Sequence, residues 1–281
     1  MKISSLIFIL ALLVASSGYS QDIVTGYITD SQTKKPVPYV NIGIIKLMKG
    51  TVSDDSGTFK LNYSSETDVV SFSAIGYETV TRSVEDLIGQ EEVLLVPVRY
   101  DLEEITVQQK ALDSITELGY NLKKRGESVG FGSTQLGTEI GGVLKIDRET
   151  NIYSAHFTFN HTSKDSMIFR VNIYEMENGR PSANLIPENV LLEAPIEPGT
   201  VSVNLSRFNI ITDKDVLLSL EWVEAVSLGD NEIQSITFRA QKTRKNPNTW
   251  FRSTSFSPFI KFDEFVKYNI GFYITAQQVR K

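Results

Sequence analysis

Short stretches of alternating apolar and polar residues dominate the chain from Asp22 to about Val98. Turn residues separate them about every eight to twelve positions, which is typical of a small β-sandwich. The pattern predicts strands at residues 23–30, 39–45, 51–53, 58–63, 69–75, 78–84 and 92–98. We therefore expect a seven-stranded sandwich with little room for helix.

One pair of these strands has the pattern of a hairpin. Thr51–Ser53 leads through Asp54-Asp55-Ser56-Gly57 into Thr58–Tyr63. Glycine adopts the positive φ angle that tight turns need, and an aspartate can accept hydrogen bonds from the turn backbone. We expect Gly57 to supply that conformation and Asp54 to cap the turn.

The pattern changes after residue 107. Ala111, Ile115, Leu118 and Leu122 fall on one face at helical spacing, with Lys123-Lys124-Arg125 at the end where a helix dipole favours cations. This predicts one amphipathic helix over 108–124. Glycines then recur at positions 126, 130, 132, 137, 141 and 142, which indicates a linker.

From residue 143 onward the β pattern resumes. The best strand, Val216–Val223, is nearly continuous in apolar residues, so we expect it in the centre of a sheet. About eight strands separated by turns predict a jelly-roll-like β-sandwich. The expected organisation is thus all-β: a signal peptide (1–20), a first sandwich (21–99), a short helical linker (100–142) and a second sandwich (143–281).

A set of motifs in the first sandwich resembles a known domain family. They are Gly26-x-Ile28-x-Asp30, Pro36-Val37-Pro38-Tyr39-Val40-Asn41-Ile42, Gly50-Thr51, Ser53-Asp54-x-x-Gly57-x-Phe59 and Ser71-Phe72-Ser73-x-Ile75-Gly76-Tyr77. In this order they resemble the carboxypeptidase regulatory-like (transthyretin-like) domain over roughly residues 22–99. The resemblance implies a non-catalytic, immunoglobulin-like sandwich.

The segment that follows is similar to part of a larger class of proteins. Leu102–Val107 resembles the acidic and β-branched segment that joins this domain to the plug of TonB-dependent receptors. Only 174 residues follow Val107, too few for a receptor barrel of about 22 strands at about 10 residues each. We therefore expect a relative of the receptor front end that lacks plug and barrel.

The N-terminus predicts export. Lys2 precedes an apolar run from Ile3 to Val14 and then small and polar residues up to Ser20, the order of a secretory signal peptide cleaved after Ser20. No later stretch is long and apolar enough to predict a transmembrane segment in the mature chain. We expect a protein of the periplasm or outer-membrane surface of a Gram-negative bacterium.

Composition narrows the chemistry. The chain has no cysteine, which excludes disulfides, thiolate chemistry and a cysteine-linked lipid anchor. Its net charge is −6, with both signs interspersed, and this argues against nucleic acid as a partner.

Candidate catalytic and metal-binding residues are sparse. The two histidines, His156 and His161, lack a glutamate three residues later, so a zinc carboxypeptidase site is not expected. No nucleophile elbow or phosphate-binding loop accompanies them. Calcium remains an open alternative at acidic residues in turns, namely Asp54, Asp55, Glu66, Asp213 and Asp215. We predict no catalytic residues, no metal and no cofactor.

An aromatic cluster near the C-terminus is the candidate contact site. Trp250 and Phe251 precede Phe256, Phe259 and Phe262, and exposed aromatics of this kind stack on sugar rings in carbohydrate-binding sandwiches. The alternative is that the phenylalanines pack in a core. We predict a non-enzymatic interaction or accessory module whose partner is an envelope protein or a surface glycan, with Trp250 and Phe251 as possible contacts. The alternative function is a carbohydrate-binding accessory protein that uses the second sandwich.

Overall fold

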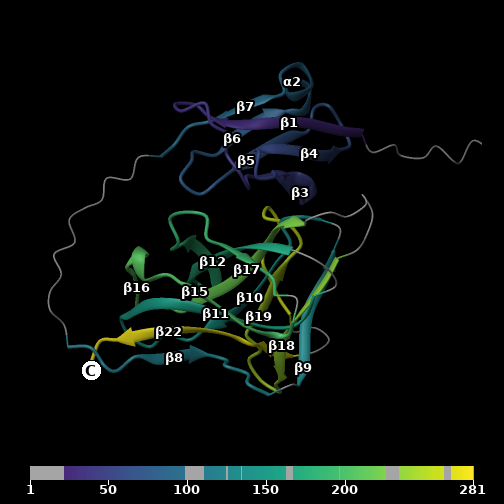
Figure 1. The fold of residues 1–281 in the computed structure, drawn as a ribbon. Coiled ribbons are helices and arrows are strands. Elements are labelled where there is room, and N and C mark those ends of the chain that lie inside the picture. Colours follow the sequence, from purple (N-terminus) through teal and green to yellow (C-terminus); the bar gives the residue numbers. More distant parts are fainter. Residues whose placement is uncertain are drawn as a thin grey trace, which may run out of the picture.

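A computed structural model of the chain contains two β-sandwiches, drawn one above the other in Figure 1. It describes residues 22–98, 111–124, 126–133, 135–162, 167–195, 197–225, 234–262 and 267–280. The predicted signal peptide (1–20) and the acidic segment Leu102–Val107 lie outside the described residues.

The N-terminal sandwich has the seven strands that the sequence predicts. They are β1 (Asp22–Asp30), β2 (Asn41–Ile44), β3 (Lys49–Val52), β4 (Thr58–Tyr63), β5 (Val69–Ser73), β6 (Val80–Ser83) and β7 (Glu92–Leu95). One sheet has the order β4-β1-β7 and the other β3-β2-β5-β6. Alternate side chains of both sheets fill the space between them, with Phe59 and Phe72 in edge-to-face contact at 5.5 Å.

The predicted hairpin around Gly57 is wrong in its pairing. Strand β3 pairs with β2, whereas β4 pairs with β1 in the opposite sheet. The turn therefore connects a strand of one sheet to a strand of the other. Phe59 and Leu61 of β4 bury their side chains in the core between the two sheets. Its local chemistry is as expected: Gly57 has φ +77°, and the Asp54 carboxylate accepts hydrogen bonds from backbone N–H groups within the turn.

A short helix, α2 (Val84–Gly89), interrupts the sandwich where the sequence predicts only strand and turn. Ser83 and Asp86 form a reciprocal capping box at its start. That Ser-x-x-Asp spacing was the signal in the sequence. Two 3₁₀ turns, η1 (Ile45–Leu47) and η2 (Ser206–Phe208), complete the described helical elements.

The C-terminal sandwich is built from two larger sheets. Its strands are β8 (Thr116–Gly119), β9 (Glu127–Ser133), β10 (Glu139–Leu144), β11 (Thr150–Thr162), β12 (Met167–Glu177), β13 (Arg180–Asn184), β14 (Leu191–Glu193), β15 (Gly199–Asn204), β16 (Ile210–Thr212), β17 (Val216–Ala225), β18 (Gln234–Lys242), β19 (Thr249–Arg252), β20 (Ile260–Lys261), β21 (Tyr268–Ile270) and β22 (Phe272–Gln278). The seven-stranded sheet has the order β13-β12-β17-β10-β19-β20, with β14 beside β12. The eight-stranded sheet has the order β21-β18-β11-β22-β8, in which β15 and β16 also pair with β11, and β9 pairs with β18.

The predicted helical linker is wrong for the residues that the structure describes. Residues 111–124 contain strand β8, which pairs with β22. Four of the six glycines assigned to the linker lie in β9 and β10, namely Gly130, Gly132, Gly141 and Gly142. An added Cβ at Gly130 would come within 1.9 Å of the Ile236 carbonyl oxygen of the paired strand. Strand pairing and close backbone approach thus determine the conformation of this segment, although its apolar residues are spaced as in a helix.

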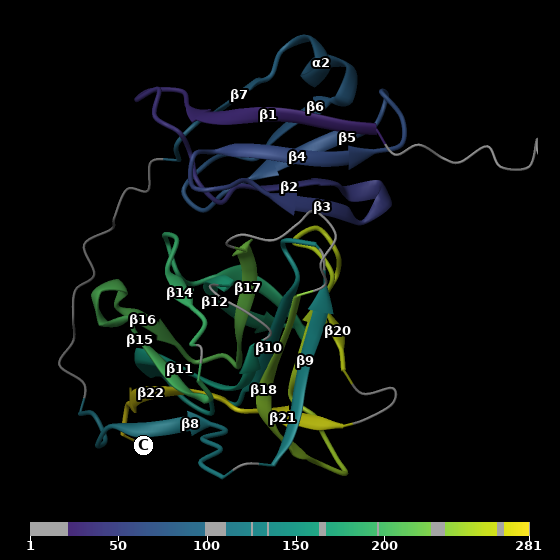
Figure 2. The same cartoon turned by 45° about the vertical axis from the view of Figure 1, so that its right-hand side comes forward.

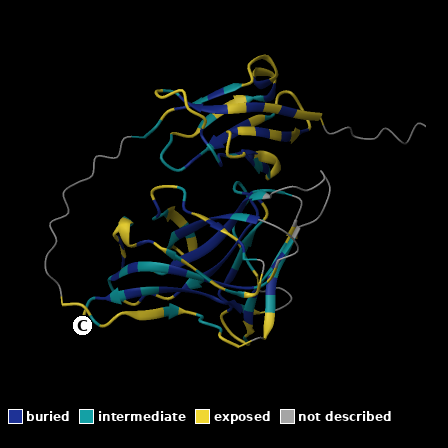
Figure 3. Ribbon diagram, in the orientation of Figure 1, coloured by how far each residue is buried: buried dark blue, intermediate teal, exposed yellow. Residues whose placement is uncertain are grey.

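The expectation for Val216–Val223 is confirmed. This segment lies within β17, between β12 and β10 in the seven-stranded sheet. Its inward side chains join the large core between the two sheets, which Figure 3 shows as the dark-blue interior of the C-terminal sandwich. None of the helices in the described residues is long and apolar enough to cross a membrane.

The two sandwiches contact each other through a small apolar cluster. Tyr39 and Val52 of the N-terminal sandwich are buried with Val223 of β17 and pack against Ile168 of β12. The ring of Phe256 lies on Gly43, where an added Cβ would come within 2.4 Å of the ring. Figure 2 shows β2 and β3 on the side of the N-terminal sandwich that faces β12 and β17.

We predict that Gly57→Val destabilises the N-terminal sandwich by about 1–3 kcal/mol, since a β-branched residue is strained at positive φ. A Cβ at Gly57 would also lie 2.7 Å from the Ile28 carbonyl oxygen. Thermal unfolding measures the loss. Gly89→Val is the matched control, because nothing lies within 4 Å of a Cβ there. Equal melting temperatures for the two variants would contradict this account of the turn.

Candidate functional site

The face of the seven-stranded sheet that points away from the core carries the candidate site. Inward residues of β12 and β17, such as Val171 and Leu220, belong to the core between the sheets. The residues that alternate with them project from the opposite face by strand alternation. We call this opposite face of β12, β17, β10 and β19 the outer face.

Four charged residues form one cross-strand row on the outer face. Arg170 pairs in register with Glu221, Glu221 with Glu139, and Glu139 with Arg252. The two neighbouring glutamates are thus flanked by an arginine at each end. We call this set the charged row. Arg170, Glu221 and Glu139 are 2% exposed or less, so their charges interact with little screening by water.

Glu139 accepts hydrogen bonds through both of its carboxylate oxygens. Oε1 accepts hydrogen bonds from Asn172 Nδ2 at 3.0 Å and Ser219 Oγ at 2.5 Å. Oε2 accepts from Arg252 Nε at 2.7 Å and also pairs with its Nη2. Arg252 in turn donates to the Tyr174 hydroxyl at 3.1 Å. The carboxylate therefore ties together four strands.

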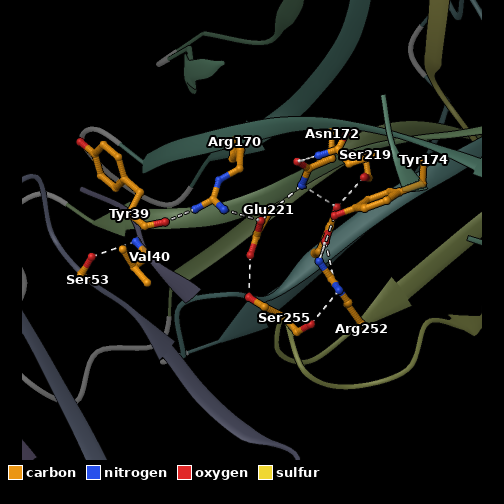
Figure 4. A network of polar contacts seen from close by, with 12 residues as sticks. Tyr39, Val40, Ser53, Arg170, Asn172, Tyr174, Ser219, Glu221, Arg252 and Ser255 are labelled. Atoms are coloured by element: carbon orange, nitrogen blue, oxygen red, sulfur yellow. Dashed lines mark hydrogen bonds and ion pairs between the residues drawn. The ribbon is translucent and has the colours of Figure 1, made fainter. Parts of the chain in front are cut away.

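Glu221 connects the charged row to the N-terminal sandwich. Its Oε1 accepts from Ser255 Oγ at 2.6 Å, and its Oε2 lies 3.6 Å from Arg170 Nη1. Arg170 also donates through Nη2 to the backbone carbonyl of Tyr39 (Figure 4). Tyr39 has φ +56° and donates from its hydroxyl to Glu224. The C-terminal sheet thus holds Tyr39, which has a left-handed backbone conformation, both at its backbone carbonyl and at its side-chain hydroxyl.

The pKa values of the two glutamates are shifted in opposite directions. Burial raises the pKa of Glu139, and the nearby charge of Glu221 adds to this, although Arg252 opposes it. Burial also disfavours the charged form of Glu221, but Arg170 and Arg252 together with hydrogen bonds outweigh it and lower its pKa. The structure thus favours the ionised form of Glu221 and disfavours that of Glu139.

Three cavities lie along the outer face. The interdomain cavity, about 240 Å³, is bounded by the two sandwiches, with Asn41 on one side and Arg170 on the other. A second cavity of about 690 Å³ lies beyond Tyr174 and Arg252, which line both. A third, about 920 Å³, lies on the far side of Trp250.

Trp250 lines both of the larger cavities, which we call the Trp250 cavities. It is partly exposed, and its partner in the neighbouring strand is Gly141, which has no side chain. Phe259 lines the 690 Å³ cavity, with the Arg252 guanidinium 4.5 Å from its ring centre. Polar side chains supply hydrogen-bonding groups around the two cavities: Arg180, Ser182, Asn246 and Lys261.

The other predicted aromatics lie elsewhere. Phe251 packs against the core between the sheets, 6.3 Å from Phe131, so it faces away from the candidate site. Phe256 contacts the N-terminal sandwich. Phe262 is 38% exposed and lines none of the three cavities. The alternative that Phe256, Phe259 and Phe262 pack in a core is therefore wrong, because Phe256 and Phe259 are only half-buried and Phe262 is exposed.

His156 and Asp215 have local partners. His156 stacks on Tyr273 and hydrogen-bonds Ser202 through Nδ1, and burial lowers its pKa. His161 is exposed near the end of the same strand. Asp215 accepts from the backbone N–H of Ile146. Within the described parts of the chain, no three histidine, aspartate or glutamate residues are grouped as a metal site would require.

Sequence reasoning missed the charged row. The signal was present: Arg170 and Glu221 each have large apolar residues on both sides in a strand, and a buried charge is unfavourable unless it is paired. What the sequence does not contain is the register that brings Glu139 and Arg252 beside them.

Comparison with known proteins identifies the N-terminal part. Residues 24–107 match the family model of the CarboxypepD_reg-like domain, as the motifs predict. No curated protein matches the chain.

Solved structures give distant likenesses. The clostridial cysteine protease Cwp84 after propeptide cleavage is 8% identical with a TM-score of 0.41, and the match covers 93% of this chain and 66% of that one. The cysteine protease and lectin-like domains of Cwp84, a surface layer associated protein of Clostridium difficile, match at 8% identity and a TM-score of 0.41 over 93% and 59%. The chain thus spans less than two thirds of the length of either.

Isosteric substitutions test the charged row. We predict that Glu221→Gln destabilises the C-terminal sandwich by about 3–5 kcal/mol at neutral pH, because Arg170 loses its buried counter-charge. Glu139→Gln should cost less, since burial already disfavours that charge. Thermal unfolding at pH 7 measures both, and an equal or larger loss for Glu139→Gln would contradict this assignment.

The same variants have a predicted pH dependence. Because the pKa of Glu221 is lower in the fold than its ordinary 4.5, its contribution is complete above that value and disappears as the pH falls through the lowered pKa. The stability gap between wild type and Glu221→Gln should therefore narrow on acidification below about pH 4.5. Melting temperatures measured from pH 7 to pH 3 test this, and a constant gap would show that Glu221 does not titrate this way.

Proposed function

We propose that the protein is an exported, non-catalytic binding protein that holds a glycan on the outer face of its C-terminal sheet. The observation that carries this proposal is the position of Trp250, partly exposed and shared by two cavities of about 690 and 920 Å³. Binding sites for small ligands combine such apolar and aromatic walls with a few polar groups.

The chemistry of the Trp250 cavities suits a sugar chain. The C–H face of a pyranose ring is apolar and stacks on an indole, whereas its hydroxyls need hydrogen-bond partners. Arg180 and Ser182 offer such partners in one cavity, and Asn246 and Lys261 in the other. Because the cavities lie on both sides of Trp250, the site accommodates more than one ring.

The two buried glutamates support binding better than hydrolysis. A glycosidase needs two carboxylates that both reach the scissile bond. Here Glu139 lines none of the three cavities, and its oxygens accept hydrogen bonds from Asn172, Ser219 and Arg252. We assign these carboxylates to holding the sheet and its loops in place.

The setting of the proposed function is the cell envelope. The CarboxypepD_reg-like match and the predicted signal peptide both support export, and a surface glycan is the ligand class available there. An envelope protein remains the alternative partner, and it becomes the better hypothesis if the chain binds no glycan.

Binding to a glycan array tests the proposal, using the chain without its first 20 residues. We expect selective binding to a group of related glycans, and Trp250→Ala should weaken it at least about tenfold, equivalent to about 1.4 kcal/mol. Phe262→Ala is the matched control, because Phe262 is exposed but lines none of the three cavities. Absence of binding to any glycan, or an equal effect of both substitutions, would contradict the proposal.

A further inference from the structure

The cross-strand neighbour of Trp250 is a lysine. Trp250 of β19 pairs in register with Gly141 on one side and with Lys261 of β20 on the other. Directly opposed residues of an antiparallel pair point to the same face of the sheet, with Cβ atoms about 4.5–5.5 Å apart. Lys261 therefore projects from the outer face beside the indole, and it lines the 920 Å³ cavity together with Trp250.

A second basic residue lies on the other side of Trp250. Arg180 begins β13 and lines the 690 Å³ cavity, which Trp250 also lines. It is exposed, whereas Lys261 is half-buried. A sugar ring stacked on the indole thus has Arg180 toward one cavity and Lys261 toward the other.

The charged residues around the two Trp250 cavities are mostly basic. Arg180 and Arg252 line the 690 Å³ cavity, and no acidic residue from the described parts of the chain does. Lys145, Lys261 and Asp215 line the 920 Å³ cavity. The lining therefore has an excess of positive charge, in a chain where 34 acidic residues outnumber 28 basic ones.

Two of these four basic residues have acidic partners within the fold. Lys145 Nζ lies 2.5 Å from Asp215 Oδ2, and Arg252 belongs to the charged row. Within the described residues, neither Arg180 nor Lys261 takes part in an ion pair. The excess charge of the site thus comes from the two residues that lie on opposite sides of Trp250.

The carboxylates near Arg180 are bound elsewhere. Glu177 lies opposite Arg180 in the hairpin of β12 and β13. Its Oε1 is 2.6 Å from Lys214 Nζ, which also pairs with Glu175 at 2.9 Å. Neither glutamate lines any of the three cavities, so a ligand there meets Arg180 and not these acids.

Two cations without internal partners select the charge of the ligand. A carboxylate or sulfate beside Lys261 or Arg180 gains a charge-assisted hydrogen bond, which is stronger than a bond between neutral groups. A cationic ligand would be repelled by both residues, and a neutral sugar would leave their charges without a counter-charge. An anionic sugar is thus favoured over a neutral sugar of the same shape.

We infer that the glycan bound along Trp250 is anionic, with carboxylate or sulfate groups that pair with Lys261 and Arg180 on the two sides of the indole. This inference rests on the proposed glycan-binding function and narrows its ligand class. It assigns the discrimination between glycans to β13 and β20, the first and last strands in the order of the seven-stranded sheet.

The test pairs each anionic probe with a neutral counterpart. The probes are trigalacturonate against galactotriose, trimannuronate against mannotriose, and a sulfated galactan tetrasaccharide against its desulfated form. Calorimetry with the chain from residue 21 should show an anionic probe binding at least about tenfold more tightly than its counterpart. The uronates and the sulfated probe distinguish the two anionic groups. The preference should shrink when salt is raised from about 50 mM to about 500 mM, because salt screens exposed charges.

Removal of each charge locates the preference. Lys261→Gln and Arg180→Gln should each weaken binding of the anionic probe about three- to fivefold and affect its neutral counterpart less, because glutamine keeps a hydrogen-bonding side chain without the charge. Lys60→Gln, at an exposed site on β4 of the N-terminal sandwich, is the matched control and should change nothing. Equal melting temperatures of the three variants show that all of them are folded.

The outcomes separate this inference from the proposed function. Neutral probes that bind as tightly as their anionic counterparts, or an array that is positive for neutral glycans only, would overturn the inference and leave the proposed function standing. An anionic preference that survives both Lys261→Gln and Arg180→Gln would also overturn it. Equal binding of a single-stranded DNA oligonucleotide would do the same, since it indicates a basic patch without selectivity for sugars. An array without any bound glycan removes the proposed function, and this inference with it.

Discussion

The pairing of two buried glutamates with Arg170 and Arg252 is the interaction on which the rest of the structure depends. Register alone brings Arg170, Glu221, Glu139 and Arg252 into one row across four strands. Such a row is costly to desolvate, and removal of one member leaves an uncompensated charge. Asn172, Ser219 and Ser255 donate hydrogen bonds to the two carboxylates of the row. These bonds form only with a single arrangement of the sheet and of the loop after β19.

That arrangement also positions the N-terminal sandwich. The guanidinium of Arg170 reaches out of the row to the Tyr39 carbonyl, next to the apolar contact of Tyr39 and Val52 with Val223. Phe256 approaches Gly43 closely because that position has no side chain. The sheet that carries Trp250 and the N-terminal sandwich thus adjoin at the interdomain cavity, and their separation depends on the buried charges.

The sequence predicts the parts of this protein better than their assembly. Strand positions in the N-terminal sandwich follow from residues such as Phe59 and Leu61, whose alternation marks the buried face, and Gly57 marks a turn. Pairing is a different matter, since β3 and β4 lie in separate sheets although only a turn connects them. In residues 111–124 the apolar spacing is helical, yet pairing with β22 produces strand β8. Trp250 is a candidate contact from its residue type alone. The partners of Glu139 are not evident in this way, because Asn172, Ser219 and Arg252 lie 33, 80 and 113 residues further along the chain.

A distance measurement across the two sandwiches tests the central claim most directly. The chain has no cysteine, so spin labels at Lys60→Cys on β4 and Lys242→Cys on β18 attach without background. Both positions are exposed. Double electron–electron resonance should give one narrow distance distribution in the otherwise unmodified chain, because the charged row and the Tyr39 contact fix the two sandwiches as one unit. A broad or multimodal distribution would show that the two sandwiches move independently, and would contradict the docking.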